Sequence, residues 1–209
     1  MKTIVIVLNG ENLHAHRLPS VLHKADIIIA ADGGANFCLR HDIRPHYIIG
    51  DLDSIRVEHE QLLPDSEVIR IDDQYSTDLQ KAMKLAETLH GDRWLIINAT
   101  GKRADHTLAN LLFLADKAQT VNLQVIDNYG SLRFLAPGEH SFDLPIGTTV
   151  SLLAWQAVKN ITLSGFRYPL RNRDFETFFV GISNVVSATP CTITFSQGLL
   201  VMYEAEQRV

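Results

Sequence analysis

One stretch of the sequence indicates the fold class: Ile27-Ile28-Ile29-Ala30-Ala31-Asp32-Gly33-Gly34-Ala35, an apolar run that ends at an acid and two glycines. An unbroken apolar run is typical of a strand that is covered on both faces, as in a parallel sheet. The same sequence of apolar run, turn and amphipathic stretch recurs as far as Asn128. The expected strands are Thr3–Leu8, Ile27–Ala31, Tyr47–Ile49, Val68–Ile71, Trp94–Asn98 and Leu123–Ile126.

Stretches with helical periodicity separate these runs. Apolar residues recur at i, i+3, i+4 and i+7, which places them on one face of a helix. They form three sets: Leu18, Val21, Leu22 and Ala25; Leu79, Ala82, Met83 and Ala86; Leu108, Leu111, Leu112 and Ala115. The signals for helices after Asp32 and after Asp53 are weaker. Strands that alternate with helices predict a doubly wound, mostly parallel α/β domain, Rossmann-like with three layers, over residues 1–129.

The pattern changes after residue 129. Short apolar runs are separated by Gly, Pro or Asn turns, and no helical stripe is present. The runs are Ser131–Leu135, His140–Leu144, Thr148–Leu153, Val158–Ser164, Cys191–Ser196 and Leu199–Tyr203. Cys191–Ser196 alternates strictly, and Gln197-Gly198 predicts a hairpin turn into the last strand. We therefore predict a small all-β domain over residues 130–209, a sandwich or a barrel.

Composition excludes several classes of protein. The 209 residues allow one large domain or two small ones, and 46% hydrophobic with 21% charged residues is typical of a globular protein. No run approaches about 18 consecutive apolar residues, and no signal peptide is recognisable, so we expect no membrane association. A formal charge of -5 argues against a nucleic-acid binder. Cys38 and Cys191 have no metal-ligand or disulfide spacing, which favours a reducing, cytoplasmic compartment.

Acids and glycines follow the expected strands, at the edge where open parallel sheets bind ligands. Asp32-Gly33-Gly34 is either an ordinary capping turn or a loop that approaches a phosphate at a helix N-terminus. In Gly50-Asp51-Leu52-Asp53-Ser54, a helix cap explains one acid and leaves the other unexplained. Two carboxylates that point the same way along an extended chain repel unless they share a cation or a proton. Mg²⁺ is bound in this way, through one or two carboxylates and substrate phosphates.

Two later loops add to this edge. Thr77 and Gln80 fit a capping box, and Asp78 would lie in the first helical turn, where an acid is favourable. In Gly101-Lys102-Arg103-Ala104-Asp105, the Arg103 fork suits phosphate oxygens, although an exposed Lys-Arg pair before an N-cap Asp105 is the plainer interpretation. Carboxylates and cations at one sheet edge suit metal-assisted transfer of a phosphorus group.

The sequence resembles the thiamin pyrophosphokinase family. The matching motifs are Asp32–Ala35, Gly50–Ser54, Ser76–Ala82, Gly101–Asn110, Ser164–Leu170 and Ile182–Asn184, in the family's order and over nearly the whole chain. Lys102 departs from the pattern, standing where a second glycine is common, and Tyr168 stands where some relatives have Trp. The resemblance implies a nucleotide-binding catalytic domain, then a β-sandwich that binds thiamin and dimerises, in a homodimer with active sites at the subunit interface.

The resemblance also implies the reaction: the hydroxyl of thiamin attacks the β-phosphorus of ATP, giving thiamin diphosphate and AMP. The implied catalytic residues are Asp51, Asp53, Asp78, Asp105 and Arg103, with Asp51, Asp53 and Asp78 as ligands of Mg²⁺ and Asp105 as a further ligand or a proton acceptor. The implied ATP contacts are Asp32, Gly33, Gly34, Thr77, Gly101 and Arg103. The implied thiamin contacts are Tyr168, Ser183 and Asn184, with Tyr168 stacked on a ring; ordinary packing is the alternative for Tyr168.

Two other functions remain open at this point. The acids could serve another Mg²⁺-dependent phosphotransferase that acts on a small alcohol. Alternatively, the chain could be a non-catalytic module that senses a nucleotide or thiamin. So many carboxylates argue against a sensing module, because neutral donors and cations would bind phosphate without them.

Overall fold

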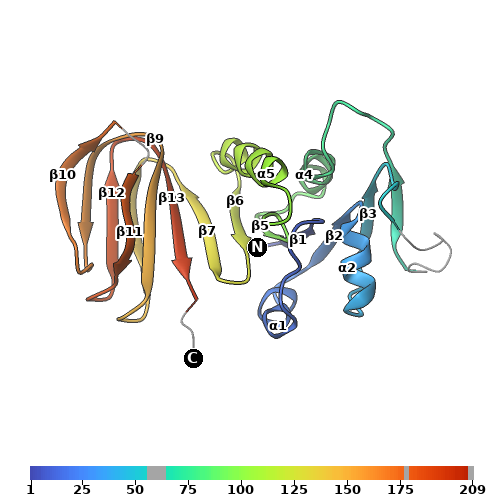
Figure 1. The fold of residues 1–209 in the computed structure, drawn as a ribbon, viewed down its shortest axis with the longest axis horizontal. Coiled ribbons are helices and arrows are strands. Elements are labelled where there is room, and N and C mark those ends of the chain that lie inside the picture. The colour runs from blue at the N-terminus through green and yellow to red at the C-terminus, as the bar shows by residue number, and fades with distance from the viewer. Residues whose placement is uncertain (56–64, 177–178, 207–209) are drawn as a thin grey trace. The chain divides into compact units, whose positions relative to one another are not determined.

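The computed structural model describes residues 1–55, 65–176 and 179–206, shown in Figure 1. It divides into two compact units, Met1–Asn128 and Tyr129–Val209. Within the described ranges, no helix combines the length and the hydropathy that a membrane span requires.

The first unit is built on a parallel sheet. Its described strands are β1 (Thr3–Val7), β2 (Ile27–Ala31), β3 (Tyr47–Gly50), β4 (Glu67–Arg70), β5 (Arg93–Ile97) and β6 (Asn122–Ile126). They lie in the order β4-β3-β2-β1-β5-β6, and every neighbouring pair is parallel. The predicted strands of this unit all occur, with ends displaced by at most one residue. The chain first builds the sheet outward from β1 and then returns to add β5 on its other side, so the strand order reverses at β1 and β5.

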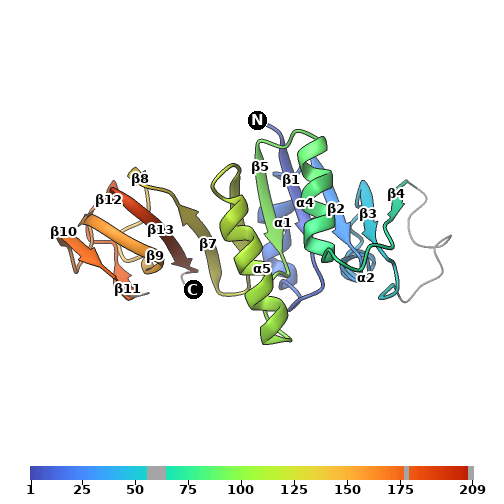
Figure 2. The same ribbon diagram turned by 90° about the horizontal axis from the view of Figure 1, so that it is seen from above.

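Helices cover both faces of this sheet (Figures 1 and 2). A short 3-10 turn, η1 (Ala15–Arg17), leads into α1 (Leu18–Leu22), which lies with α2 (Gly34–Arg40) on one face, while α4 (Asp78–Thr88) and α5 (Ala104–Lys117) lie on the other. The helix predicted after Asp53 falls outside the described residues. The residues of the central strand β1 are all buried, as its unbroken apolar run requires, whereas the edge strand β4 is largely exposed.

The periodicity identified the buried face of α4 but not that of α5. Leu79, Ala82, Met83 and Ala86 are buried, as predicted. In α5 the prediction is wrong for Leu108 and Leu112, which are 59% and 58% exposed. Ala115 is buried as predicted, together with Leu114, which the predicted set did not include. The sequence of α5 is apolar on more than one side, from Leu111 to Ala115, so spacing alone does not show which side meets the sheet.

The second unit consists of antiparallel strands. They are β7 (Gly130–Leu135), β8 (Gly138–Phe142), β9 (Thr149–Ser164), β10 (Leu170–Phe175), β11 (Phe179–Val185), β12 (Cys191–Phe195) and β13 (Gln197–Ala205). The long strand β9 organises them: its first half pairs with β11 and β13, and its second half with β10 and β12. The core of this unit forms around alternate residues of β9, including Val150, Leu152 and Ala154.

Three details of this unit differ from the sequence prediction. Thr148–Leu153 and Val158–Ser164 belong to one continuous strand, not two. The strands β10 and β11 were not predicted; β10 has the polar centre Arg171-Asn172-Arg173-Asp174, all exposed, so it lacks apolar alternation. The hairpin at Gln197-Gly198 is also wrong, because β12 and β13 are paired with β9 rather than with each other in the described pairings. Alternation identifies a strand without identifying its partner.

Candidate active site

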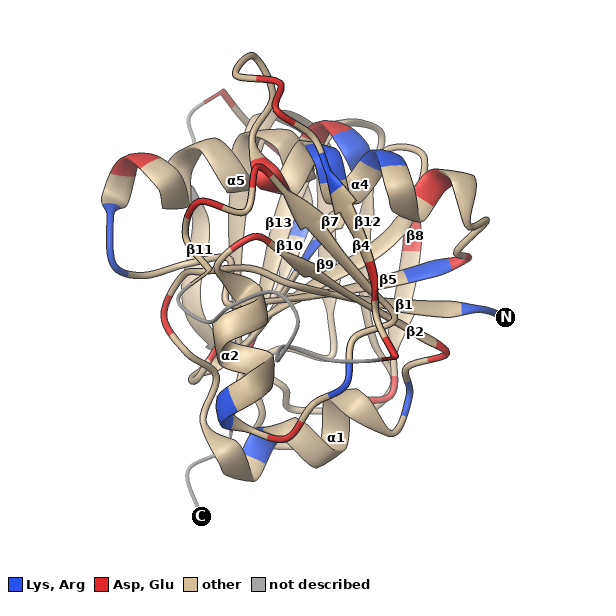
Figure 3. Cartoon of the chain, turned by 90° about the vertical axis from the view of Figure 1, so that its right-hand side faces the viewer, with Lys and Arg blue, Asp and Glu red and all other residues tan. Residues whose placement is uncertain are grey.

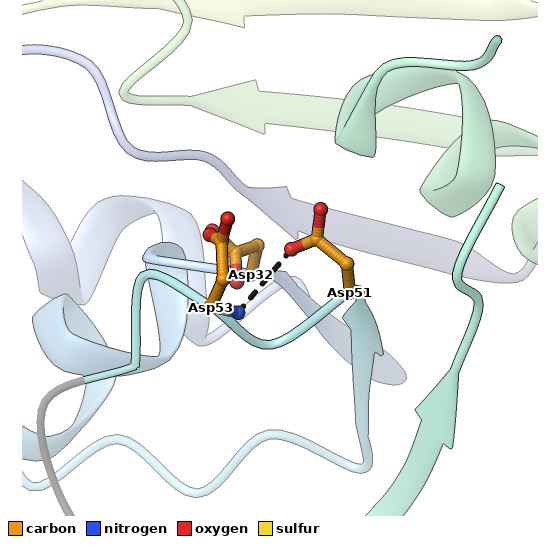
Figure 4. A group of neighbouring side chains, drawn as sticks. All are labelled: Asp32, Asp51 and Asp53. Atoms are coloured by element: carbon orange, nitrogen blue, oxygen red, sulfur yellow. Dashed lines mark hydrogen bonds between the residues drawn. The ribbon is translucent and has the colours of Figure 1, made fainter. Parts of the chain in front are cut away.

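Three aspartates meet at the carboxyl ends of two neighbouring strands (Figure 4). Asp32 follows β2, and Asp51 and Asp53 follow β3. One carboxylate oxygen from each lies within 4.8 Å of the others. Asp32 is buried, Asp51 is half-buried and Asp53 is exposed, so the group extends from the protein interior to solvent.

The backbone after β3 turns sharply to bring its two acids together. Leu52 has φ 70, in the left-handed region that non-glycine residues rarely occupy, and its side chain is buried in the core. The Asp53 N–H donates to Asp51 Oδ1 at 3.2 Å, and Ser54 Oγ donates to Asp53 Oδ1 at 3.0 Å. The chain does not stay extended here, and a turn with the buried Leu52 at its centre places the two carboxylates beside each other.

Gly50 allows a fourth acid, Asp78, to approach Asp32. A Cβ at Gly50 would lie 2.8 Å from the Cβ of Asp32 and 3.3 Å from Oδ1 of Asp78. Asp78, at the start of α4, is therefore adjacent to Asp32 across the Gly50 backbone. Burial raises the pKa of Asp78, and the negative charge of Asp32 raises it further, whereas the neighbouring Lys81 opposes both effects.

Lys81 is a buried cation beside these acids. Its side chain is 3% exposed, and its Nζ lies 3.4 Å from Asp78 Oδ1. The preceding turn is fixed by the predicted capping box, which is confirmed: Thr77 Oγ1 accepts from the Gln80 N–H at 3.3 Å, and Gln80 Oε1 accepts from the Thr77 N–H at 2.9 Å. The side chain of Thr77 is thus engaged in starting the helix that carries Asp78 and Lys81.

The loop after β5 forms its own ion pair. Asp105 does not cap α5; the N-cap residue is Arg103. Arg103 Nε donates to Asp105 Oδ1 at 3.1 Å and Nη2 donates to Oδ2 at 2.6 Å, on the exposed surface. This fork lowers the pKa of Asp105 to about 2. Among the described residues, Asp105 is not a member of the three-carboxylate group.

Lys102 and Gly34 hold loops against the end of β1. Lys102, with φ 55, donates from Nζ to the Asn9 carbonyl at 2.7 Å. A Cβ at Gly34 would lie 2.1 Å from the Val7 carbonyl oxygen, and one at Gly33 would lie 2.2 Å from Nδ2 of Asn9. The two glycines thus allow α2 to begin tightly against β1. The capping turn considered from the sequence is not found, because Gly33 is the N-cap residue and no side chain caps α2. Gly101 has φ 80, so it also occupies a turn.

The residues present fit a divalent cation. Asp32 Oδ1 is buried and has no hydrogen-bond partner among the described residues. An unpaired carboxylate oxygen next to two more carboxylates is costly unless a cation balances it. Oxygen ligands of this kind are those that Mg²⁺ prefers. From the sequence, Asp32 was expected to contact ATP and was not considered as a metal ligand, although its position after β2 matches that of Asp51 after β3.

The second unit brings the three expected thiamin contacts together. Asn184 is 7% exposed; its Oδ1 accepts from the Tyr168 N–H at 3.0 Å, and its Nδ2 donates to the Tyr168 carbonyl at 2.9 Å. Tyr168 itself is 66% exposed, which contradicts ordinary packing as the reason for its ring. Ser183 is exposed, has φ 57 and donates its N–H to Ser151 Oγ at 3.0 Å. A buried amide therefore fixes the backbone of an exposed aromatic residue.

Comparison with known proteins gives a consistent result. The family model "Thiamin pyrophosphokinase, catalytic domain" matches residues 18–125, and "Thiamin pyrophosphokinase, vitamin B1 binding domain" matches residues 139–200. A thiamine pyrophosphokinase of Bacillus subtilis is 29% identical over 210 residues, covering 97% of this chain and 98% of the relative.

Solved structures of the same kind superpose closely. The B. subtilis thiamine pyrophosphokinase crystal structure has a TM-score of 0.87 at 28% identity, covering 99% of this chain and 100% of that one. The thiamin pyrophosphokinase of Geobacillus thermodenitrificans has a TM-score of 0.84 at 26% identity, with 98% of each chain covered. Since the catalytic-domain model alone spans more than half of the sequence and the second model matches the remaining unit, the chain belongs to the thiamin pyrophosphokinase family.

Proposed function

We propose that this chain transfers a diphosphoryl group from ATP to the hydroxyl group of thiamin, producing thiamin diphosphate and AMP. Membership of a family of transferases supports the reaction class. The observation that carries the proposal is the carboxylate group of Asp32, Asp51 and Asp53, with a buried unpaired oxygen, at the ligand-binding edge of an α/β sheet.

Mg²⁺ is the proposed cofactor, held by Asp51 and Asp53 together with Asp32, and with Asp78 beside them. When bound, it would neutralise phosphate charge and orient the polyphosphate. The protein supplies a fixed set of oxygens: the left-handed turn at Leu52 sets two carboxylates, and the buried position of Asp32 sets the third. Such preorganised charge is more effective than mobile water in stabilising a transition state.

The chain's other residues at this edge have proposed roles in holding ATP. The backbones at Gly33, Gly34 and Gly101 lie in loops that follow strands, where N–H groups bind phosphate, whereas the N–H of Thr77 is engaged by Gln80 and Thr77 would contact ATP by another group. Arg103 donates to Asp105 in the structure, and because both side chains are exposed, its fork is free to turn towards phosphate oxygens. While the fork holds Asp105, the pKa of that carboxyl is lowered, so Arg103 has to turn towards phosphate before Asp105 could serve as a further metal ligand or as the acceptor of the hydroxyl proton.

Thiamin is proposed to bind the second unit, at Tyr168, Ser183 and Asn184. The exposed Tyr168 ring offers a π face to the positively charged thiazolium, an attraction of about 0.5–2 kcal/mol that orients the substrate. We further propose that residues 1–129 form the Rossmann-like catalytic domain and residues 130–209 a thiamin-binding and dimerising β-sandwich. The proposed assembly is a cytoplasmic homodimer with active sites at the subunit interface.

The test is to incubate the protein with ATP, Mg²⁺ and thiamin and to identify both products by ³¹P NMR and chromatography. AMP with thiamin diphosphate is the expected result, and EDTA should abolish it. ADP with a monophosphate would indicate another phosphotransferase. Binding of both substrates without any product would indicate a sensing module instead.

A further inference from the structure

The loop between β5 and α5 contains a cation that no step of the proposed reaction uses, Lys102. The residue is exposed, and its Nζ donates to the carbonyl oxygen of Asn9 at 2.7 Å and to Oδ1 of the same residue at 3.2 Å. Figure 3 shows basic residues directly before α5 and an acidic residue at its start. Since Asn9 follows β1 and β1 pairs with β5, the two bonds hold the ammonium at the carboxyl ends of two neighbouring strands.

The charge of Lys102 is not balanced by a carboxylate in the part of the chain that the structure describes. Both of its acceptors are uncharged oxygens of Asn9. The next residue differs, because Arg103 is paired with Asp105. An ammonium group has three N–H donors and no acceptor, so Lys102 offers a full positive charge to an anion that reaches this edge of the sheet.

Asn9 also places the ammonium beside the loop that leads away from Asp32. A Cβ at Gly33 would lie 2.2 Å from Nδ2 of Asn9, so the Asn9 amide is in close contact with the Gly33 backbone. Gly33 directly follows Asp32, whose buried unpaired oxygen belongs to the carboxylate group. A ligand bound at the backbone of residues 32–33 would therefore be near both the proposed metal-binding acids and the Lys102 cation.

Lys102 occupies this position in a strained backbone conformation. Its φ is 55, in the left-handed region that glycine adopts readily and other residues rarely. The loop has supports that do not involve the ammonium: the Glu11 N–H donates to the Thr100 carbonyl at 2.7 Å, and Thr107 Oγ1 donates to the Gly101 carbonyl at 3.3 Å. Strain of this kind is typical of functional sites, and it indicates a use for the lysine side chain beyond holding the loop.

We propose that Lys102 binds the polyphosphate of the nucleotide substrate through its ammonium group, an inference that rests on the proposed function. The polyphosphate of ATP carries more negative charge than one Mg²⁺ neutralises, so a second cation beside the metal site stabilises the bound form. Lysine serves this purpose as a point charge on a flexible stem. The ligands that Lys102 selects are therefore polyphosphates, recognised by charge and not by the base.

The test removes the charge and retains the aliphatic stem. The Kd values of ATP, inorganic triphosphate and thiamin are measured by calorimetry with Mg²⁺ for the full-length protein and for Lys102→Met. We expect the Kd of ATP and that of triphosphate to rise about tenfold, because a charge-assisted hydrogen bond is lost, while the Kd of thiamin stays unchanged. Lys102→Arg keeps the charge and should restore most of the affinity.

Lys24→Met is the matched control. Lys24 is also an exposed lysine of the first unit, but it precedes β2 and so lies at the amino ends of the strands. This variant should leave all three constants unchanged. Ionic strength gives a further check: at about 1 M KCl the difference between the unmodified protein and Lys102→Met should shrink, because the Debye length is then only ~3 Å.

Lys102→Gly separates binding from a structural role. Glycine suits φ 55, so this variant should be about as stable in denaturant as the unmodified protein, yet bind ATP and triphosphate as weakly as Lys102→Met does. Lower stability of both variants, with weaker binding of thiamin as well, would assign Lys102 a structural role and overturn the inference.

The remaining outcomes also decide the inference. Unchanged Kd values of ATP and triphosphate in Lys102→Met would overturn it and leave the proposed reaction intact. A rise for ATP without a rise for triphosphate would overturn it too, because the ammonium would then contact another part of the nucleotide. Absence of thiamin diphosphate from the unmodified protein would instead refute the proposed function, whatever the variants show for triphosphate.

Discussion

The carboxylate group of the first unit and the Tyr168–Asn184 pair of the second unit are opposite kinds of site. In the first, a buried Asp32 oxygen has no partner among the described residues, and the neighbouring carboxylates repel it. In the second, a buried Asn184 amide is satisfied on both its oxygen and its nitrogen, and what remains open is an exposed ring. The first site is therefore the one for which we propose a bound cation, whereas the buried polar groups of the second are satisfied without a ligand.

This difference predicts that mutations in the two sites separate activity from stability in different ways. Replacing one carboxylate of the first unit relieves repulsion among its neighbours. The fold should therefore stay intact while the function is lost. Losing Asn184 should damage the fold of its surroundings as well.

The largest effect is expected for Asp53→Asn. The side chain is exposed and takes part in the carboxylate group, so its charge is available to the proposed cation and does not support the core. We expect kcat to fall by at least about 10²–10³-fold, with the thermal midpoint unchanged or slightly raised. Steady-state assay and calorimetry measure the two quantities. Asp72→Asn, an exposed acid paired with Arg70 outside the group, is the control and should retain activity; normal turnover by Asp53→Asn would remove it from the metal site.

Gly50→Ala should have the next largest effect, and it should lower both kcat and the unfolding free energy. The new methyl would lie 2.8 Å from the Asp32 Cβ, so the acid or the strand must move. Overpacking of this kind costs about 1–3 kcal/mol of unfolding free energy, and a displacement near 1 Å at the chemistry lowers kcat by up to about 10²-fold. Denaturant unfolding and assay test both. Gly181→Ala, with open space around the new Cβ, should leave the stability unchanged; equal stability losses would show that close contact at Gly50 is not the cause.

Tyr168→Ala and Asn184→Ala should differ from each other. Removing the exposed ring should raise the KM for thiamin about 2- to 30-fold, the equivalent of 0.5–2 kcal/mol, without changing stability. Removing the Asn184 amide leaves the Tyr168 N–H and carbonyl without partners. This change should lower the unfolding free energy by about 1–3 kcal/mol as well as raising the KM for thiamin. Stability measured by denaturant and KM measured with saturating ATP distinguish the two variants. A large stability loss in Tyr168→Ala would restore the packing interpretation.

Strand ends were predictable because unbroken apolar runs and the acids that follow them depend on local sequence. The runs that end at Asp32 and Asp51 place both acids at one edge in any parallel sheet. What the sequence did not reveal depends on tertiary structure. The turn at Leu52 needs a left-handed residue that no composition rule predicts, and the role of Asp32 depends on its burial beside Gly50.

The second unit was harder to predict for a related reason. A strand such as β10 carries exposed polar residues and is held by pairing with β9, so its own pattern contains little information. Asn184 was expected to contact thiamin directly; its buried bonds to Tyr168 could not be inferred from spacing, because the two residues come from separate segments.

The smallest expected effect is a change in the labelling rate of two buried cysteines. Each unit contains one of them, so their labelling follows the two units separately. Burial raises the pKa of the Cys38 thiol to about 12 and also raises that of Cys191, so neither thiol should react with iodoacetamide in the folded protein at pH 8. Labelling then requires opening of the unit that holds each cysteine. ATP with Mg²⁺ at about five times its Kd should slow labelling of Cys38 about sixfold, since a ligand that binds only the folded unit divides the equilibrium constant for opening by one plus that ratio.

Labelling of Cys191 serves as the internal control, with each site quantified by peptide mass spectrometry. If nucleotide binds the first unit alone, ATP with Mg²⁺ should leave the rate at Cys191 unchanged. Thiamin without nucleotide should have the reverse effect and slow only Cys191. Equal protection of both cysteines by either substrate would mean that the two units open together, and the contrast between an ion-dependent site and a preformed one would then not extend to their local stabilities.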